Sequence, residues 1–131
     1  MSKVKKALDD WDPKGLWEKE IDYRADLACF LREELPESFV VEEYGHGRSR
    51  KDIKIESKES DKAVAIELKY NLNSSNEANR LLGQTLRYKD SVDVIFVILI
   101  NCNPNHVAEI EKSLQHNFEE DTVELITMEI E

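Results

Sequence analysis

Two carboxylates and one amine in the middle of the chain are the residues with the clearest potential for chemistry. Asp52 opens one β-branched segment, and Glu67 and Lys69 stand two residues apart in a later one. Carboxylate oxygens are hard ligands that suit Mg²⁺ or Mn²⁺. A bound divalent ion lowers the pKa of its water and offsets charge on a phosphate, while a nearby lysine can orient that water. These residue types are therefore typical of a metal-dependent hydrolytic site, provided that the fold brings them together.

A β-hairpin would bring them together. Residues 39–44, 52–57 and 62–70 are short and partly alternating, with turn residues between them, which predicts a three-stranded meander. If the last two strands are closed by residues 58–61, paired positions have numbers that sum to 119, so Asp52 faces Glu67. The apolar residues Ile53, Ile55, Val64, Ile66 and Leu68 then share the opposite face. The alternative interpretation is an ordinary cross-strand charge pattern, with Asp52 merely following a turn.

Helices before and after the meander follow from periodicity and capping residues. Before Pro36, apolar residues recur at steps of three or four: Trp17, Ile21, Ala25, Ala28, Leu31 and Leu35. This spacing predicts an amphipathic helix that begins at Pro13 and is capped by Asp12, with Glu18 near its start. Ser74 and Glu77 form a capping box for a second helix that runs to about residue 89.

The remainder of the chain completes an α/β fold. The run 92–100 is apolar on both faces, which favours a central strand covered on both sides. A third helix over about 104–116 and a last strand over 122–130 give the order αβββαβαβ. We therefore expect a mixed central sheet flanked by helices, in a single domain over residues 1–131. Cys29 and Cys102 have no disulfide or metal spacing, and we expect both to be buried as small hydrophobic residues.

The spacing of the three site residues resembles that of a known family. Asp52, fourteen residues, and then Glu67-Leu68-Lys69 is similar to the motif of the PD-(D/E)XK nuclease superfamily, whose restriction endonuclease-like core has the order αβββαβ. Lys51 stands where the name of the motif has proline. The resemblance implies that Asp52 and Glu67 bind the metal and that Lys69 acts on the attacking water.

Two further segments resemble members of this superfamily. Residues 17–31 are similar to the first helix of archaeal Holliday-junction resolvases, which implies that Glu18 is a third acid at the metal, with Glu20 as the second choice. Gln84 and Tyr88 are similar to the QxxxY pair of RecB-type nucleases, which makes Gln84 a candidate catalytic residue. Arg80, Gln84 and Tyr88 are spaced to share one helix face, which could face DNA.

The charge distribution offers candidates for nucleic-acid binding. The net charge is −10, which is unusual for a protein that binds phosphate. Residues 45–54, however, hold four bases and one acid, and residues 80–90 hold three bases and one acid. We expect phosphate or base contacts from six residues: Arg48, Arg50, Lys51, Arg80, Arg87 and Tyr88. Solvated loops and helix faces are the alternative interpretation of both segments.

Together these features predict a Mg²⁺- or Mn²⁺-dependent nuclease that hydrolyses DNA. A non-catalytic module that binds nucleic acid or a partner on the same fold, or an RNA nuclease, are the alternatives. A homodimer is plausible because one small domain offers little surface to grip a duplex. No apolar run reaches the roughly 18 residues that span a bilayer, so we expect a cytoplasmic protein with no membrane contact.

Overall fold

Helices and strands alternate along most of the chain. The computed structural model describes residues 2–44, 51–58, 61–119 and 121–130. The helices are α1 (Ser2–Asp10), α2 (Glu20–Glu34), α3 (Ser75–Tyr88) and α4 (Pro104–Asn117). The strands are β1 (Ser38–Tyr44), β2 (Lys51–Ser57), β3 (Ala63–Tyr70), β4 (Val94–Ile100) and β5 (Val123–Met128). From α2 to β4 the order is αβββαβ, as predicted, and α4 and β5 follow it.

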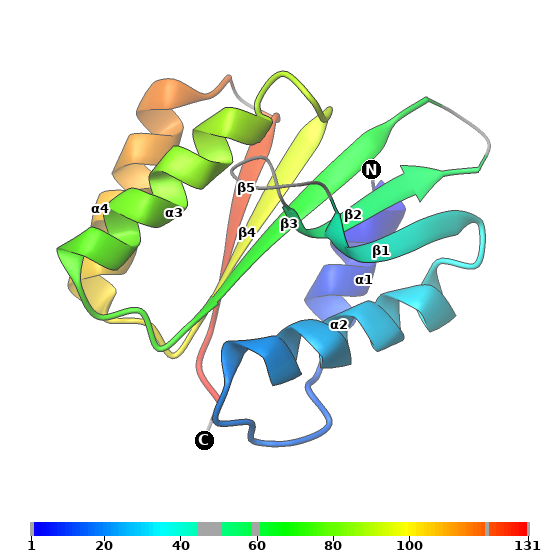
Figure 1. Cartoon of the computed structure of the whole chain (residues 1–131), viewed down its shortest axis with the longest axis horizontal. Helices are drawn as coiled ribbons and strands as arrows, with labels where there is room; N and C mark the ends of the chain where they lie inside the picture. The colour runs from blue at the N-terminus through cyan, green and yellow to red at the C-terminus, as the bar shows by residue number, and fades with distance from the viewer. Residues whose placement is uncertain (1, 45–50, 59–60, 120, 131) are drawn as a thin grey trace.

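The strands form one mixed sheet in the order β1-β2-β3-β4-β5 (Figure 1). The meander β1-β2-β3 is antiparallel, whereas β3, β4 and β5 run parallel because α3 and α4 carry the chain back between them. The predicted α/β class with a mixed, helix-flanked sheet is confirmed. β4 lies inside the sheet, and its residues from Ile95 to Ile100 are buried, as its apolar sequence indicated.

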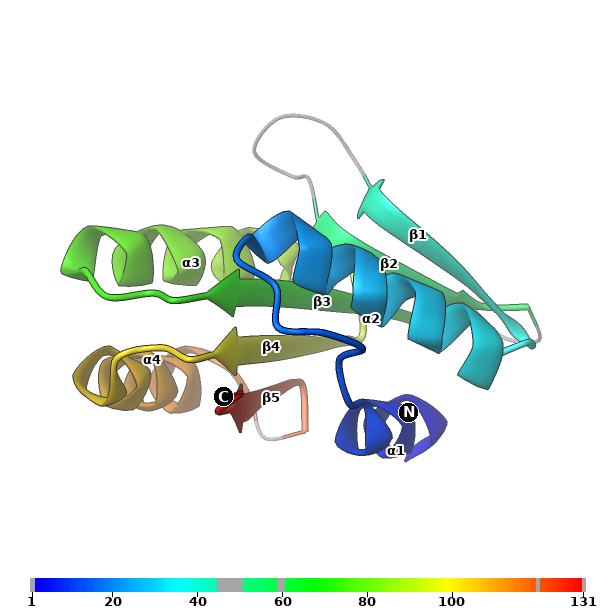
Figure 2. The same cartoon turned by 90° about the horizontal axis from the view of Figure 1, so that it is seen from below.

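Each face of the sheet carries its own hydrophobic cluster. α1 and α2 pack on one face, where their side chains meet Ile53, Ile66 and Leu68. α3 and α4 pack on the other face over Ala65 and Val97. Figure 2 shows the two pairs of helices on opposite sides of the strands. Among the described residues, no helix combines the length and apolar character needed to cross a membrane.

The region before β1 differs from the sequence-based prediction. α1 was not expected, although Val4, Ala7, Leu8 and Trp11 are buried at helical spacing. The helix predicted from Pro13 begins only at Glu20, so Asp12 is not its cap. Residues 11–17 are instead held by the buried carboxylate of Asp26, and this is the physical reason for the late start of α2. Asp26 accepts hydrogen bonds from Trp11 Nε1 (3.1 Å), Lys14 N (2.8 Å) and Trp17 Nε1 (2.9 Å).

The buried face of α2 also differs from the predicted stripe. Trp17 and Ile21 are 37% and 53% exposed, and Tyr23 and Leu27 are buried in their place. Ala28, Leu31 and Leu35 are buried as predicted, so the difference is confined to the start of the helix, where Glu20 contacts β3. Cys29, expected to be buried, is exposed, whereas Cys102 is half-buried.

Candidate active site

The hairpin of β2 and β3 has the predicted register. Ile53 pairs with Ile66 and Ile55 with Val64. Asp52 immediately precedes Ile53 on β2, and Glu67 immediately follows Ile66 on β3, so both lie next to the Ile53–Ile66 pair. The side chain of Asp52 adds a hydrogen bond between the two strands, because its Oδ2 accepts the backbone N–H of Leu68 at 2.9 Å. One oxygen of Asp52 is thus fixed to the strand that carries Glu67.

Glu67 is the most deeply buried acid of this region, with 1% of its surface exposed. The hydroxyl of Tyr88, on α3, donates a hydrogen bond to Glu67 Oε2 at 2.9 Å. The pKa of Glu67 is raised to about 8, mainly by burial and then by the charge of Asp52, while the hydrogen bond from Tyr88 and the charge of Lys69 lower it. Two carboxylates therefore share a poorly solvated space, and a cation that compensates their charge would stabilise the ionised pair.

Lys69 lies two residues beyond Glu67 on β3 and meets an acid from α2. Its Nζ is 3.7 Å from Glu20 Oε2, and Glu20 Oε1 accepts the backbone N–H of Tyr70 at 3.3 Å. Burial raises the pKa of Glu20, while Lys69 lowers it and Asp52 contributes a smaller increase. Glu20 thus connects the first turn of α2 to the end of β3.

Glu18, the preferred third acid in the sequence-based prediction, is not in this cluster. It precedes α2 and is exposed, and the described contacts of Asp52, Glu67 and Lys69 do not include it. The physical reason is the late start of the helix. Lys14 and Trp17 donate hydrogen bonds to Asp26, and the segment that contains them is not helical. The second choice, Glu20, occupies the position next to Lys69.

Arg24 is a member of the cluster that the sequence pattern did not indicate. It is 8% exposed. Its Nη1 lies 3.8 Å from Asp52 Oδ1, and its Nε lies 3.8 Å from Glu42 Oε2. Arg24 lies four positions after Glu20 on α2, so both project from the same helix face. This i, i+4 spacing is the sequence signal that could have placed Arg24 in the cluster, had Glu20 been chosen as the third acid.

Helix α3 contributes a buried residue and several exposed ones. Tyr88 has no exposed surface, so its ring is not available to a nucleic-acid base, and the expected contact with DNA is replaced by the hydrogen bond to Glu67. Gln84 lies one turn earlier on the same face, and its Oε1 is buried without a hydrogen-bond partner among the described residues. Arg80 and Arg87 are exposed and accessible to a phosphate.

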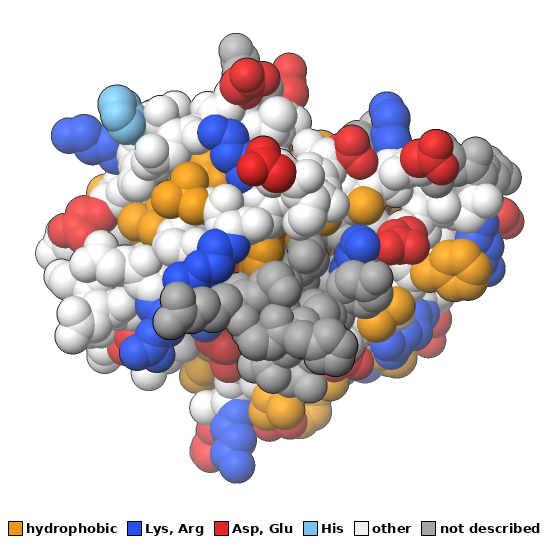
Figure 3. All heavy atoms as spheres, turned by 45° about the horizontal axis from the view of Figure 1, so that its top comes forward, with side chains coloured by type: hydrophobic (Ala, Val, Ile, Leu, Met, Phe, Trp, Pro, Cys, Tyr) orange, Lys and Arg blue, Asp and Glu red, His pale blue; other side chains and the backbone are white. Residues whose placement is uncertain are grey.

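The predicted basic segment before Asp52 is described only in part. Arg48 and Arg50 lie outside the described residues, as does the side chain of Lys51. On the face shown in Figure 3, Lys and Arg side chains lie among Asp and Glu side chains and form no continuous basic surface. On the described part of this face, separate Lys and Arg side chains could therefore contact a phosphate backbone one at a time.

The donor set fits a single hard cation. Within the described ranges, no group of three or more His, Cys, Asp and Glu side chains is arranged to hold a metal ion. Mg²⁺ commonly uses only one or two carboxylates and completes its shell with waters and substrate phosphates, so Asp52 and Glu67 suffice. Four acids and three bases form the contact network: Glu20, Glu42, Asp52, Glu67, Arg24, Arg32 and Lys69. With all seven ionised the network keeps a negative charge, which favours a bound cation.

The chain was compared with protein families, curated proteins and solved structures. No protein-family model, curated protein or solved structure matches the chain.

Proposed function

We propose that this protein is a Mg²⁺-dependent nuclease that hydrolyses phosphodiester bonds in DNA, with the PD-(D/E)XK superfamily as the family it resembles. The observation that carries the proposal is the contact network at the end of the β2–β3 hairpin. Two adjacent carboxylates, a lysine and a third acid meet there from three separate elements.

Asp52 and Glu67 would hold the metal ion, Mg²⁺ or Mn²⁺. When bound there, the ion would supply a water of lowered pKa and offset charge on the phosphate. The protein prepares both ligands. Leu68 N–H and Arg24 orient the two oxygens of Asp52, and the hydroxyl of Tyr88 orients Glu67. Fixed ligands of this kind lose less conformational freedom when they bind a cation.

Lys69 would act on the attacking water and on the charge of the phosphate. Its side chain is 20% exposed, so it is reachable from solvent, and Glu20 restrains its ammonium group. A positioned ammonium can orient the water and stabilise negative charge as it develops. Gln84, with its unpartnered oxygen, would assist. Arg80 and Arg87, together with Arg48, Arg50 and Lys51, would contact flanking phosphates, and the leaving group would be the 3′-oxygen of DNA.

A cleavage assay tests the proposal. Linear, circular, branched and single-stranded DNA, and RNA, are incubated with the protein in Mg²⁺, in Mn²⁺ or in EDTA. We expect metal-dependent cleavage of at least one DNA. Cleavage of RNA alone would favour the ribonuclease alternative. Binding of nucleic acid without cleavage in either metal would favour the non-catalytic module.

Substitutions then assign the roles. We expect Asp52→Asn, Glu67→Gln and Lys69→Met each to slow cleavage by about two orders of magnitude or more, a usual scale for a lost catalytic group. Glu18 and Glu20 form a matched pair. Glu20→Gln should reduce cleavage strongly, whereas Glu18→Gln should leave it within about twofold because Glu18 is exposed and outside the network. An active Asp52→Asn protein would remove the central claim.

A further inference from the structure

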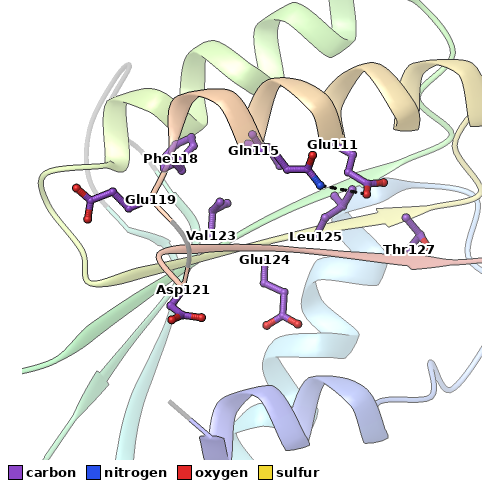
Figure 4. A pocket seen from close by; sticks show the side chains of 10 residues that line it. Glu111, Gln115, Phe118, Glu119, Asp121, Val123, Glu124, Leu125 and Thr127 are labelled. Carbon is purple, nitrogen blue, oxygen red and sulfur yellow. Dashed lines mark hydrogen bonds between the residues drawn. The ribbon is translucent and has the colours of Figure 1, made fainter.

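A long groove lies between α4 and β5, and neither Asp52 nor Glu67 lines it. It consists of two hollows of about 520 Å³ and 440 Å³, which share Glu111 and Thr127 as lining residues. Figure 4 shows the larger one, with Gln115 and Phe118 directed down from α4 and Leu125 directed up from β5. Their lining residues extend from Pro104 to Phe118, so the two adjacent hollows together follow the whole length of α4. We refer to them together as the groove.

The floor of the groove is apolar and incompletely covered. Val123 and Leu125 project from β5 toward α4, yet both are only half-buried. On β4, the next strand, the residues from Ile95 to Ile100 are all buried. The helical layer formed by α3 and α4 therefore ends before it reaches the edge of the sheet. Partly covered apolar surface of this kind is typical of an interaction site.

The rim of the groove is acidic. The described residues that line it include five acids and no lysine, arginine or histidine; the acids are Glu111, Glu119, Asp121, Glu124 and Glu129. Glu124 points to the opposite face, where Lys5 Nζ lies 3.0 Å from its carboxylate. The other four are exposed, and within the described ranges none has an ion-pair partner. Their charge is available to a cationic ligand.

We propose that this groove binds a basic amphipathic helix of a partner protein. The apolar floor requires apolar side chains, and the acidic rim favours lysine or arginine beside them. A helix laid next to α4 would cover β5 and extend the α3–α4 layer by one helix. α4 has 14 residues, which at about 1.5 Å per residue gives roughly 21 Å, so about four turns of a partner helix match the groove.

The same charges argue against other occupants. A second copy of the chain would bring an identical set of acids against this one, and nucleic acid would bring phosphates, so both would be repelled. A strand added to the free edge of β5 would lengthen the sheet but leave the space above Leu125 open. A metal ion is not favoured either, because the described residues contain no three-ligand group.

The proposal does not depend on the nuclease function. The groove residues come from α4, β5, the end of β4 and the adjoining loops, whereas the catalytic network comes from α2, from β1, β2 and β3, and from Gln84 and Tyr88 of α3. A substitution in the groove can therefore be tested by peptide binding alone, and failure of the cleavage assay would leave the result unaffected.

The test uses three fluorescent peptides of 16 residues and the full chain. The first is an amphipathic helix with Leu at i, i+3, i+4 and i+7 and Lys on its remaining face. The second has the same composition in scrambled order, and the third has Glu in place of Lys. Fluorescence anisotropy should show the first peptide binding at least about tenfold more tightly than the second, and the third not binding. Equal binding of the first two would overturn the proposal.

Variants locate the binding. Thr127→Trp fills the groove from an exposed position and should weaken binding of the first peptide at least about tenfold, and so should the double variant Glu111→Lys/Glu119→Lys. The matched control, Glu33→Lys/Glu34→Lys, makes the same charge change on exposed residues of α2. It should leave affinity within about threefold. An equal loss of peptide affinity in the control would show that net charge alone causes the effect, and would overturn the proposal. Sedimentation experiments that show self-association of the original protein, and no self-association of Thr127→Trp, would overturn it as well.

Discussion

The raised pKa of Glu67 makes the stability of the metal-free protein dependent on pH. The folded state keeps the proton of Glu67 up to about pH 8, whereas an unfolded chain releases it near the ordinary value of 4.5. Between these values the folded state binds more protons than the unfolded state, so the free energy of unfolding falls as pH rises. The stabilisation is fully present below pH 4.5 and lost as pH passes through about 8.

The size of the effect follows from the same two values. The gap between about 8 and 4.5, at about 1.4 kcal/mol per pH unit, sets an upper bound of about 5 kcal/mol. Glu67 is 1% exposed, so screening by solvent reduces this bound little. Glu67→Gln resembles the protonated acid but does not titrate. We therefore expect the variant to lose stability much less steeply than the original protein from pH 5 to 8 and to exceed it by several kcal/mol at pH 8. Glu20, whose pKa is also raised, contributes to the slope that remains.

Urea denaturation in EDTA at pH 5, 6, 7 and 8 measures both proteins. Glu56→Gln is the control, because it removes a carboxylate from β2 whose side chain is 47% exposed, and it should retain the downward slope. An unchanged slope in Glu67→Gln, or a stability of the original protein that rises over this range, would refute the assignment of the titration to Glu67.

Three further outcomes follow from the contacts around the site. Mg²⁺ affinity, measured by calorimetry, should rise with pH up to about 8 because binding requires ionised Glu67; a pH-independent affinity would exclude Glu67 as a ligand. Tyr88→Phe removes a hydrogen bond that lowers the pKa of Glu67, so the pH at which stability falls should move upward in the denaturation series, and a downward move would contradict this role. Asp26→Ala leaves Trp11 and Trp17 without their acceptor and should cost about 2–3 kcal/mol in urea denaturation, with a red shift of tryptophan fluorescence; a loss below about 0.5 kcal/mol would deny Asp26 its role.

The meander and its register could be predicted because local rules determine them. A hairpin with apolar residues on one face and a short polar turn has only one register that buries the apolar residues and exposes the turn. The pairing of Ile53 with Ile66 followed from this argument alone. Helix α3 was predictable for a similar reason, since its N-cap depends only on Ser74 and Glu77. The backbone N–H of Glu77 donates to Ser74 Oγ, and the Ser74 hydroxyl donates to Glu77 Oε1.

The start of α2 could not be predicted because a tertiary contact determines it. Asp12 and Pro13 are a good local start signal, but Asp26 captures the indole groups of Trp11 and Trp17 and the backbone of Lys14. This shifts the first turn to Glu20 and changes which residues are buried at the start of the helix. The choice between Glu18 and Glu20, and the place of Arg24 beside Asp52, depend on that shift, which the spacing of apolar residues did not reveal.

The connection between β2 and β3 has a consequence for the order of folding. Asp52 and Glu67 lie on consecutive strands, whereas Glu20 reaches β3 across 50 positions of the sequence. Closing a short loop costs less conformational entropy than closing a long one. We therefore expect the two metal ligands to meet early in folding, while Glu20 docks beside Lys69 in a later step.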